Sequence, residues 1–207
     1  MILVMDAGNT QIFLGVYEGE KLLANCRLTT ERQRTADEYG LFLMDFLANR
    51  GLAAGKVEAV VLASVVPPLT SAMIEMARVY FHCEPLVVGP GIRTGLSIRY
   101  ENPREVGADR VANAVAAVRL YGTPVIIVDF GTATTLCAVN AEAEYLGGII
   151  VPGIGISAEA LFHYAAKLPR VELKKPPQVI GKNPVTSIQS GLIYGYADLV
   201  DGLIRRM

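Results

Sequence analysis

The chain has 207 residues, 52% of them hydrophobic and 19% charged, which allows a substantial core in one large domain or two small ones. Its 19 Lys and Arg residues nearly balance its 20 Asp and Glu residues, and the net charge of −1 gives no electrostatic footprint for nucleic acid or an anionic membrane. We therefore expect a small-molecule ligand, with no nucleic-acid and no membrane partner.

The N-terminal residues 1–5 are apolar, lack a basic leader and meet Asp6 directly. This pattern predicts a short buried strand rather than a signal peptide. The other long apolar stretch, residues 147–162, is interrupted by proline and glycine and is a poor membrane span. Further strands are expected at residues 57–66 and 86–88.

Helices are expected to alternate with these strands. A capping box from Thr35 to Glu38 begins the first helix, which Gly51 ends. The helices are expected at residues 36–50, 68–81, 108–121 and 157–167, with a last one whose apolar stripe begins near Ile188 and which runs to Met207. Residues 89–103 are expected to form a loop near a domain junction, and residues 169–177 a linker or flap.

The three cysteines, Cys26, Cys83 and Cys137, are odd in number, far apart and set among apolar neighbours. They are typical of buried reduced thiols, which favours a cytoplasmic protein. The only histidines, His82 and His163, have no further ligand at metal-binding spacing, so no zinc site is expected. Both histidines are expected to pack or to cap helices.

An internal repeat organises the sequence. Residues 2–17 and 125–140 each consist of an apolar run, an Asp-x-Gly element with small polar residues, and a second apolar run. Aligning Asp6 on Asp129, an offset of 129 − 6 = 123, also aligns Gly8 with Gly131, Val4 with Ile127 and Val16 with Val139. Each copy predicts a hairpin of two buried strands joined by a tight turn.

The first Asp-x-Gly element ends in short polar donors, Asn9 and Thr10. Asp6 would project its carboxylate at the end of a strand, while Gly8 would let backbone N–H groups turn outward. This arrangement suits phosphate oxygens and a hydrated Mg²⁺ ion. An ordinary hairpin turn is the alternative, and the presence of a second copy favours a functional role.

The second element places Asp129 beside Thr132, with Thr134 and Thr135 following. Thr134 and Thr135 are also explained as good strand residues. Thr132, next to the glycine, is the stronger candidate for ligand contact. No Gly-x-x-x-x-Gly-Lys-Ser/Thr sequence is present, so any bound ATP would not use a P-loop.

A third element, residues 107–110, reads Gly-Ala-Asp-Arg at the expected start of a helix. Asp109 is either a helix N-cap or a carboxylate that orients a substrate hydroxyl for attack on a γ-phosphate. Arg110 would pair with a substrate carboxylate or form a surface ion pair. Tyr100 would line a pocket or simply pack. The sequence from Gly153 to Ala158 weakly resembles a dinucleotide-binding turn.

These elements together resemble a known family. A duplicated strand-turn-strand with Asp-x-Gly in each half is similar to the superfamily of acetate and sugar kinases, heat-shock ATPases and actin. The three elements at Asp6, at Gly107 to Arg110 and at Asp129, in this order and spacing, closely resemble type III pantothenate kinase over essentially the whole chain. The resemblance implies an α/β fold of two duplicated actin-like, ribonuclease H-like domains, residues 1–118 and 119–207, with an ATP cleft between them.

The resemblance also implies an activity and a partner set. The expected reaction is the ATP-dependent phosphorylation of pantothenate to 4′-phosphopantothenate, the first step of coenzyme A biosynthesis. ATP, Mg²⁺ and a monovalent cation, K⁺ or NH₄⁺, are implied, as is a homodimer.

The implied site residues fall into groups by ligand. Asp109 would be the catalytic proton acceptor, and Asp129 the ligand of the monovalent cation. The ATP contacts would be Asp6, Ala7, Gly8, Asn9, Thr10, Gln11, Ile12, Phe13 and Thr132. The pantothenate contacts would be Tyr100, Gly107, Ala108, Asp109 and Arg110.

Two departures from the family pattern stand out. Pro184 follows Asn183 where the family has a threonine, which removes a hydroxyl and an N–H that would face the substrate. The family also continues past the final helix into another strand and a Gly-Gly loop near the adenosine, so the chain is expected to be truncated at its C-terminus. Two other functions are compatible with parts of the pattern: another small-molecule kinase or phosphatase of the superfamily, and a non-catalytic transcription accessory protein.

Overall fold

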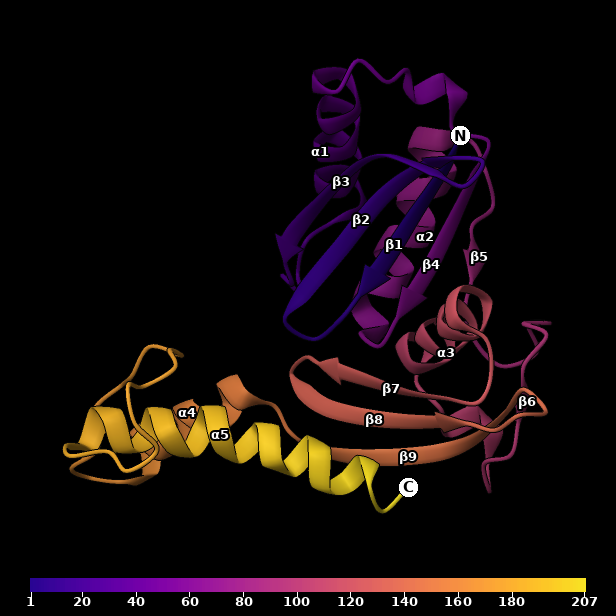
Figure 1. The fold of residues 1–207 in the computed structure, drawn as a ribbon. Helices are drawn as coiled ribbons and strands as arrows, with labels where there is room; N and C mark the ends of the chain where they lie inside the picture. Colours follow the sequence, from indigo (N-terminus) through magenta and orange to yellow (C-terminus); the bar gives the residue numbers. More distant parts are fainter. The chain divides into compact units, whose positions relative to one another are not determined.

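The computed structural model describes all residues, 1–207, and they form two compact units (Figure 1). The first unit comprises residues 1–95 and 101–115, and the second comprises residues 96–100 and 116–207. Each unit contains one sheet with helices, which confirms the mixed α/β class. The assignment of residues 1–118 and 119–207 as actin-like domains stays a prediction.

The elements are distributed between the two units as follows. The first unit contains β1 (Ile2–Ala7), β2 (Gln11–Glu18), β3 (Lys21–Thr29), α1 (Ala36–Asn49), η1 (Ala54–Lys56), β4 (Ala59–Ser64), α2 (Pro67–Phe81), β5 (Leu86–Val87) and η2 (Pro103–Glu105). The second contains β6 (Ser97–Ile98), β7 (Val125–Phe130), β8 (Ala133–Val139), β9 (Glu144–Pro152), α4 (Ile154–Tyr164) and α5 (Pro184–Ile204). Helix α3 (Ala108–Tyr121) begins in the first unit and ends in the second.

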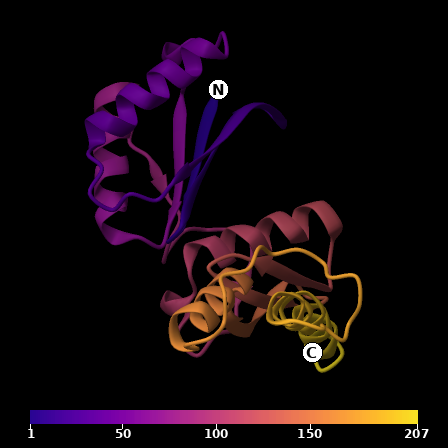
Figure 2. The same cartoon turned by 90° about the vertical axis from the view of Figure 1, so that its left-hand side faces the viewer.

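The first sheet has the strand order β3-β2-β1-β4-β5. Strands β1, β2 and β3 form an antiparallel meander, whereas β4 and β5 join it in parallel. Helices α1 and α2 lie on one face of this sheet (Figure 2). Because side chains alternate along a strand, Leu3, Met5 and Ala7 point into the core on that face, and Asp6 belongs to the opposite face.

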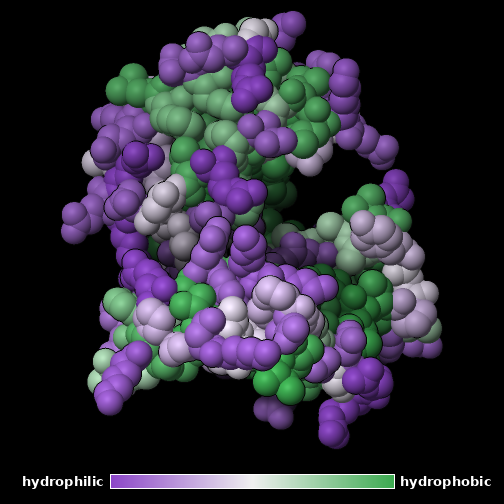
Figure 3. Space-filling view, turned by 60° about the vertical axis from the view of Figure 1, so that its left-hand side comes forward, coloured by the Kyte–Doolittle hydropathy of each residue, from purple (hydrophilic) through white to green (hydrophobic).

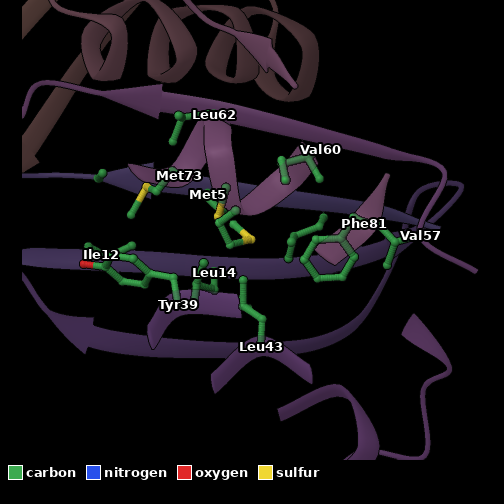
Figure 4. Close-up of a cluster of buried hydrophobic side chains, with 14 of the residues drawn as sticks. Met5, Ile12, Leu14, Tyr39, Leu43, Val57, Val60, Leu62, Met73 and Phe81 are labelled. Carbon is green, nitrogen blue, oxygen red and sulfur yellow. The ribbon is translucent and has the colours of Figure 1, made fainter. Parts of the chain in front are cut away.

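The core of the first unit lies between this sheet and its two helices. Figure 4 shows Met5 and Leu14 of the sheet, Leu43 of α1 and Met73 of α2 in one cluster. All four are at most 4% exposed. Such burial is the main stabilising contribution to a domain of this size, and it holds the ends of β1 and β2 in fixed positions.

The second sheet has the order β6-β9-β8-β7 and repeats only the meander of the first. Strands β7, β8 and β9 pair antiparallel as β1, β2 and β3 do. The fourth strand, β6, pairs in parallel with β9. It comes from within the predicted loop at residues 89–103, where no strand was expected.

Both predicted hairpins are confirmed. Their second strands, however, correspond to each other with a shift of one residue from the alignment predicted from the sequence. Asp6 lies opposite Phe13 in the first hairpin, and Asp129 lies opposite Thr135 in the second. The return strands are therefore related by 135 − 13 = 122, not by 123. The register of the next strand pair, β2 with β3 and β8 with β9, shifts once in each copy. The shift follows Val16 in the first copy and Ala138 in the second, which again differ by 138 − 16 = 122.

Most predicted helices and strands are confirmed, and the differences lie at their ends. The strand predicted at residues 57–66 is limited to β4 because Val57 closes η1 and Val66 caps α2. The helix predicted at 157–167 begins at Ile154 after Gly153, and it ends where Ala165 takes an extended conformation. Residues 169–177 contain neither helix nor strand, as predicted.

The structure also bears on the predictions made for the histidines, the cysteines and the membrane-spanning segments. His82 ends α2 in a left-handed conformation with φ of 54°, so it caps the helix as expected. The cysteines are all free thiols, but only Cys137 is fully buried. No helix has both the length and the apolar character needed to cross a membrane.

The capping box predicted for α1 is present and makes one carboxylate sensitive to pH. Glu38 accepts hydrogen bonds from the Thr35 backbone N–H at 2.7 Å and from its hydroxyl at 3.1 Å, while its own N–H donates to the Thr35 hydroxyl. The Thr35 N–H is the largest cause that lowers the pKa of Glu38 below its ordinary value of 4.5. The ionised Glu38 therefore stabilises the folded chain at pH values above its ordinary pKa of 4.5, and this stabilisation is lost as the pH falls through its lower pKa in the folded state.

We predict that the stability difference between the wild type and Glu38→Gln narrows as the pH is lowered from about 6 to about 3. Urea unfolding followed by circular dichroism at several pH values measures this difference. Glu18→Gln, at an exposed position outside any capping box, controls for the loss of one negative charge. An equal narrowing in the Glu18 variant would contradict the assignment.

Helices α1 and α2 approach closely at Gly40, where a Cβ atom would collide with the ring of Tyr80. The Tyr80 hydroxyl donates to Asp37 at 2.9 Å, which restrains that ring. We therefore predict that Gly40→Ala lowers the free energy of unfolding by about 1–3 kcal/mol through overpacking. Gly55→Ala, where a Cβ would meet no atom within 4 Å, should be close to neutral in the same denaturation experiment.

Candidate functional site

The first predicted turn, residues 8–11, is closed by its own backbone and by Thr30. The Gly8 N–H donates to the Gln11 carbonyl at 3.0 Å. The Thr30 hydroxyl donates to the Gly8 carbonyl at 2.7 Å, and the Thr30 N–H donates to the Thr10 carbonyl at 3.0 Å. The Gly8 N–H itself closes the turn, so the expectation of outward-facing backbone N–H groups applies only to the residues that follow it.

The expected ATP contacts at residues 6–13 differ in what they offer a ligand. Ala7 and Ile12 are completely buried, so neither presents an exposed atom to a ligand. Asn9, Thr10 and Gln11 are exposed at the tip of the turn. Their polar side chains follow Asp6 closely in the sequence and form a set of donors and acceptors suited to phosphate and hydrated metal.

Phe13 belongs to the same sheet face as Asp6, directly across the hairpin. Its side chain is 47% exposed, and the Arg27 guanidinium lies 4.9 Å from its ring centroid. This cation–π contact places a positive charge on the sheet face that carries Asp6.

The Gly-Ala-Asp-Arg element also belongs to the first unit, at the start of α3. Asp109 is the second residue of the helix, so of the two alternatives for this residue the N-cap does not apply. Its Oδ1 atom accepts the Arg110 backbone N–H at 2.8 Å. A Cβ atom on Gly107 would collide with this same Oδ1, so the glycine makes room for the carboxylate.

Arg110 is only 8% exposed, which excludes the prediction of a surface ion pair. A buried guanidinium requires compensating acceptors, because burying an unpaired charge is costly. Its position next to Asp109 therefore provides a positively charged group within a largely desolvated part of the first unit.

The second predicted turn, residues 131–133, lies in the second unit and is shorter than the first. The Gly131 N–H donates to the Ala133 carbonyl at 3.1 Å. Asp129 has Thr135 opposite it, whereas Asp6 has Phe13. The second carboxylate is thus accompanied by a hydroxyl rather than by an aromatic ring.

Tyr100 also belongs to the second unit, where its ring packs against β9. A Cβ atom on Gly147 would lie 3.3 Å from the Tyr100 ring, and Gly147 itself has a positive φ of 121°. The structure thus groups Asp6 and residues 107–110 in the first unit, and Tyr100, Asp129 and Thr132 in the second. No group of three or more His, Cys, Asp or Glu side chains is arranged to hold a metal ion.

Two residues near these turns were missed by the sequence analysis. Thr30 follows β3 directly and belongs to none of the sequence elements described above. A hydroxyl residue at the end of the third strand of a meander could nevertheless have indicated a contact with the turn. Tyr196 was expected only as part of the apolar stripe of α5, but its hydroxyl forms two hydrogen bonds.

The start of α5 explains the departure at Pro184. Asn183 is the N-cap, and its side chain accepts the Thr186 N–H at 2.9 Å. Proline at the first helical position needs no N–H partner, so the Asn183-Pro184 pair is a favourable helix start.

Comparison with known proteins identifies the family. The family model described as type III pantothenate kinase matches residues 2–206. The chain belongs to the type III pantothenate kinase family. Relatives named type III pantothenate kinase include one from Bacillus cytotoxicus, 55% identical, and one from Halalkalibacterium halodurans, 53% identical. Both matches cover the whole of this chain, and 79% and 82% of the respective relatives.

Solved structures of lower identity share the fold. A Baf family transcriptional activator from Campylobacter jejuni has a TM-score of 0.59 at 19% identity, over 97% of this chain and 78% of that one. A 2-dehydro-3-deoxygalactonokinase from Sinorhizobium meliloti has a TM-score of 0.51 at 13% identity, over 80% and 58%. These similarities place the pantothenate kinase chain among sugar-kinase-like folds.

Thr30 provides a test of the first turn that leaves the expected ligand contacts unchanged. We predict that Thr30→Val raises the KM for ATP about fivefold, because the loss of one hydrogen bond loosens the turn. Steady-state kinetics with varied ATP measures the change. Thr29→Val, which removes the neighbouring exposed hydroxyl of β3, is the matched control. Equal effects of the two variants would show that the hydrogen bond to Gly8 has no special role.

Proposed function

We propose that this chain transfers the γ-phosphoryl group of ATP to the hydroxyl of pantothenate, forming 4′-phosphopantothenate in the first step of coenzyme A biosynthesis. The observation that carries the proposal is the family match over residues 2–206. The presence of all three sequence elements on ordered strand or helix ends supports it.

In this proposal the first turn is the phosphate side of the ATP site. Asp6, with the exposed Asn9 and Thr10, would receive Mg²⁺ and phosphate oxygens. A single protein carboxylate fits Mg²⁺, because this ion usually keeps several waters and takes other ligands from the substrate phosphates. The bound ion would neutralise charge that develops on the phosphoryl oxygens.

Asp109 is the proposed acceptor of the pantothenate hydroxyl proton. Its Oδ1 atom is engaged by the Arg110 N–H, which leaves Oδ2 to accept a hydrogen bond from the substrate hydroxyl. A loose phosphoryl-transfer transition state needs orientation of the nucleophile more than early proton removal. A carboxylate fixed at a helix start provides that orientation.

Arg110 is the proposed partner of the pantothenate carboxylate, together with the backbone of Gly107 and Ala108. The guanidinium geometry matches a carboxylate in a bidentate manner. Tyr100 would complete the substrate contacts from the second unit. The expected ATP cleft between two domains stays part of this proposal.

Asp129 and Thr132 are the proposed second-unit contacts, the first for a monovalent cation and the second for ATP. The Asp129 carboxylate and the Thr135 hydroxyl opposite it offer oxygen ligands only, which fits a hard cation such as K⁺. The cation would add positive charge close to the ATP phosphates.

A homodimer and a cytoplasmic location are also part of the proposal. Several large apolar side chains are more than 70% exposed in the single chain: Leu120, Tyr121, Tyr164 and Ile180. Figure 3 shows apolar and polar residues interspersed on the face that it presents. The homodimer is proposed because the family resemblance implies it, and these exposed side chains are candidates for its interface.

Replacement of Asp109 tests the proposed reaction. We predict that Asp109→Asn lowers kcat by about 10²-fold or more, because it removes the proton acceptor. Formation of phosphopantothenate from pantothenate, ATP, Mg²⁺ and K⁺ measures it. Asp45→Asn, at an exposed position on α1, is the control and should retain wild-type kcat. A wild-type chain that forms no product under these conditions would refute the proposed activity.

A further inference from the structure

A hydrogen-bonded group of three residues fixes the junction between β9 and α4 in the second unit. The Tyr196 hydroxyl, on α5, lies 2.7 Å from the Pro152 carbonyl and 2.6 Å from the Ser157 hydroxyl. Pro152 is the last residue of β9, and Ser157 lies in the first turn of α4. We call Tyr196, Ser157 and the Pro152 carbonyl the Tyr196 network.

The direction of both hydrogen bonds follows from the groups involved. A carbonyl oxygen only accepts, so Tyr196 must use its single O–H hydrogen for Pro152. The Ser157 hydroxyl must then donate to the Tyr196 oxygen. Removal of the tyrosine hydroxyl therefore breaks both bonds at once, whereas removal of the serine hydroxyl breaks only one.

Gly153 connects this network to the second turn. Its N–H donates to the Thr132 carbonyl at 3.0 Å. A Cβ atom at Gly153 would collide with the carbonyl oxygens of Gly131 and Thr132. The backbone of the turn thus rests directly on the residue that follows Pro152, and any movement of Pro152 is transmitted to Thr132.

The first turn has the same backbone hydrogen bond as the second and one further bond from a hydroxyl. Thr30 binds its two carbonyls from the end of the third meander strand. In the second hairpin the strand equivalent to β3 is β9, and its end is occupied by Pro152 and Gly153. Gly153 takes the place of Thr30 and keeps its backbone hydrogen bond, but it has no hydroxyl to replace the bond from Thr30 to the Gly8 carbonyl.

We propose that Tyr196 is a positioning residue for ATP, which holds the second turn, and with it Thr132, through Pro152 and Gly153. The inference rests on the proposed function, because it assumes that Thr132 contacts the nucleotide. It assigns a role in nucleotide binding to a residue of α5 that lies 64 positions beyond Thr132 in the sequence, 196 − 132 = 64. A purely structural role for Tyr196 would instead change stability without changing ATP affinity selectively.

Tyr196→Phe separates these roles, since the ring that packs in the helix interface is retained. We expect the Kd for Mg²⁺-ATP, measured by isothermal titration calorimetry, to rise about fivefold or more. The KM for ATP should rise in parallel, with kcat within about twofold of the wild type and an unchanged KM for pantothenate. Tyr194→Phe is the matched control: its ring contacts Lys175 at 5.9 Å, and no hydrogen bond of the network depends on it.

A double-mutant cycle tests whether the network acts as one unit. Ser157→Ala should weaken ATP binding less than Tyr196→Phe does, and the double variant should be no weaker than Tyr196→Phe alone. Gly153→Ala should have the largest effect, but it also strains the fold. The Tyr196 variant is therefore the deciding one.

The outcomes distinguish this inference from the proposed function. A wild type that binds ATP but forms no phosphopantothenate would refute only the activity, and the calorimetric comparison would still decide the role of Tyr196. An unchanged Kd in Tyr196→Phe, or equal changes in the Tyr194 variant, would overturn the positioning role. A wild type that binds no ATP would overturn it as well.

Discussion

Both halves of this chain depend on one local constraint, the closure of a tight turn by the N–H of a glycine two residues after an aspartate. Gly8 donates to Gln11, and Gly131 donates to Ala133. Each bond fixes the end of a strand whose other residues are buried or paired. A carboxylate directly before such a turn is presented at a sheet edge without any need for a long loop.

The two turns are supported in part by different groups. Thr30 holds the first turn with one hydroxyl and one N–H, while the second turn rests on Gly153 and, through Pro152, on Tyr196. In both cases the support lies outside the sequence element itself. Residues that provide such support are as necessary to a preorganised site as the residues that touch the ligand.

The sequence was sufficient for the class of fold, for both hairpins and for the helix that carries Asp109. Periodicity and capping signals are local, so the box at Thr35 and the apolar stripe of α5 could be recognised without knowledge of the fold. Strand β6 could not, because two residues pair only through a ladder with the distant β9. The role of Thr30 and the burial of Arg110 likewise depend on tertiary contacts that no local pattern encodes.

The difference in turn length has a consequence for how duplicated folds diversify. Because the turn of the second hairpin is one residue shorter, each residue of its return strand takes the place that an ungapped alignment gives to the residue after it, so Thr135 rather than Leu136 faces the carboxylate. The buried face keeps its pattern, since Leu14 and Leu136 both remain in the interior. A single-residue length change in a turn is thus enough to place a different side chain opposite the aspartate in each copy of the hairpin while each retains the same core.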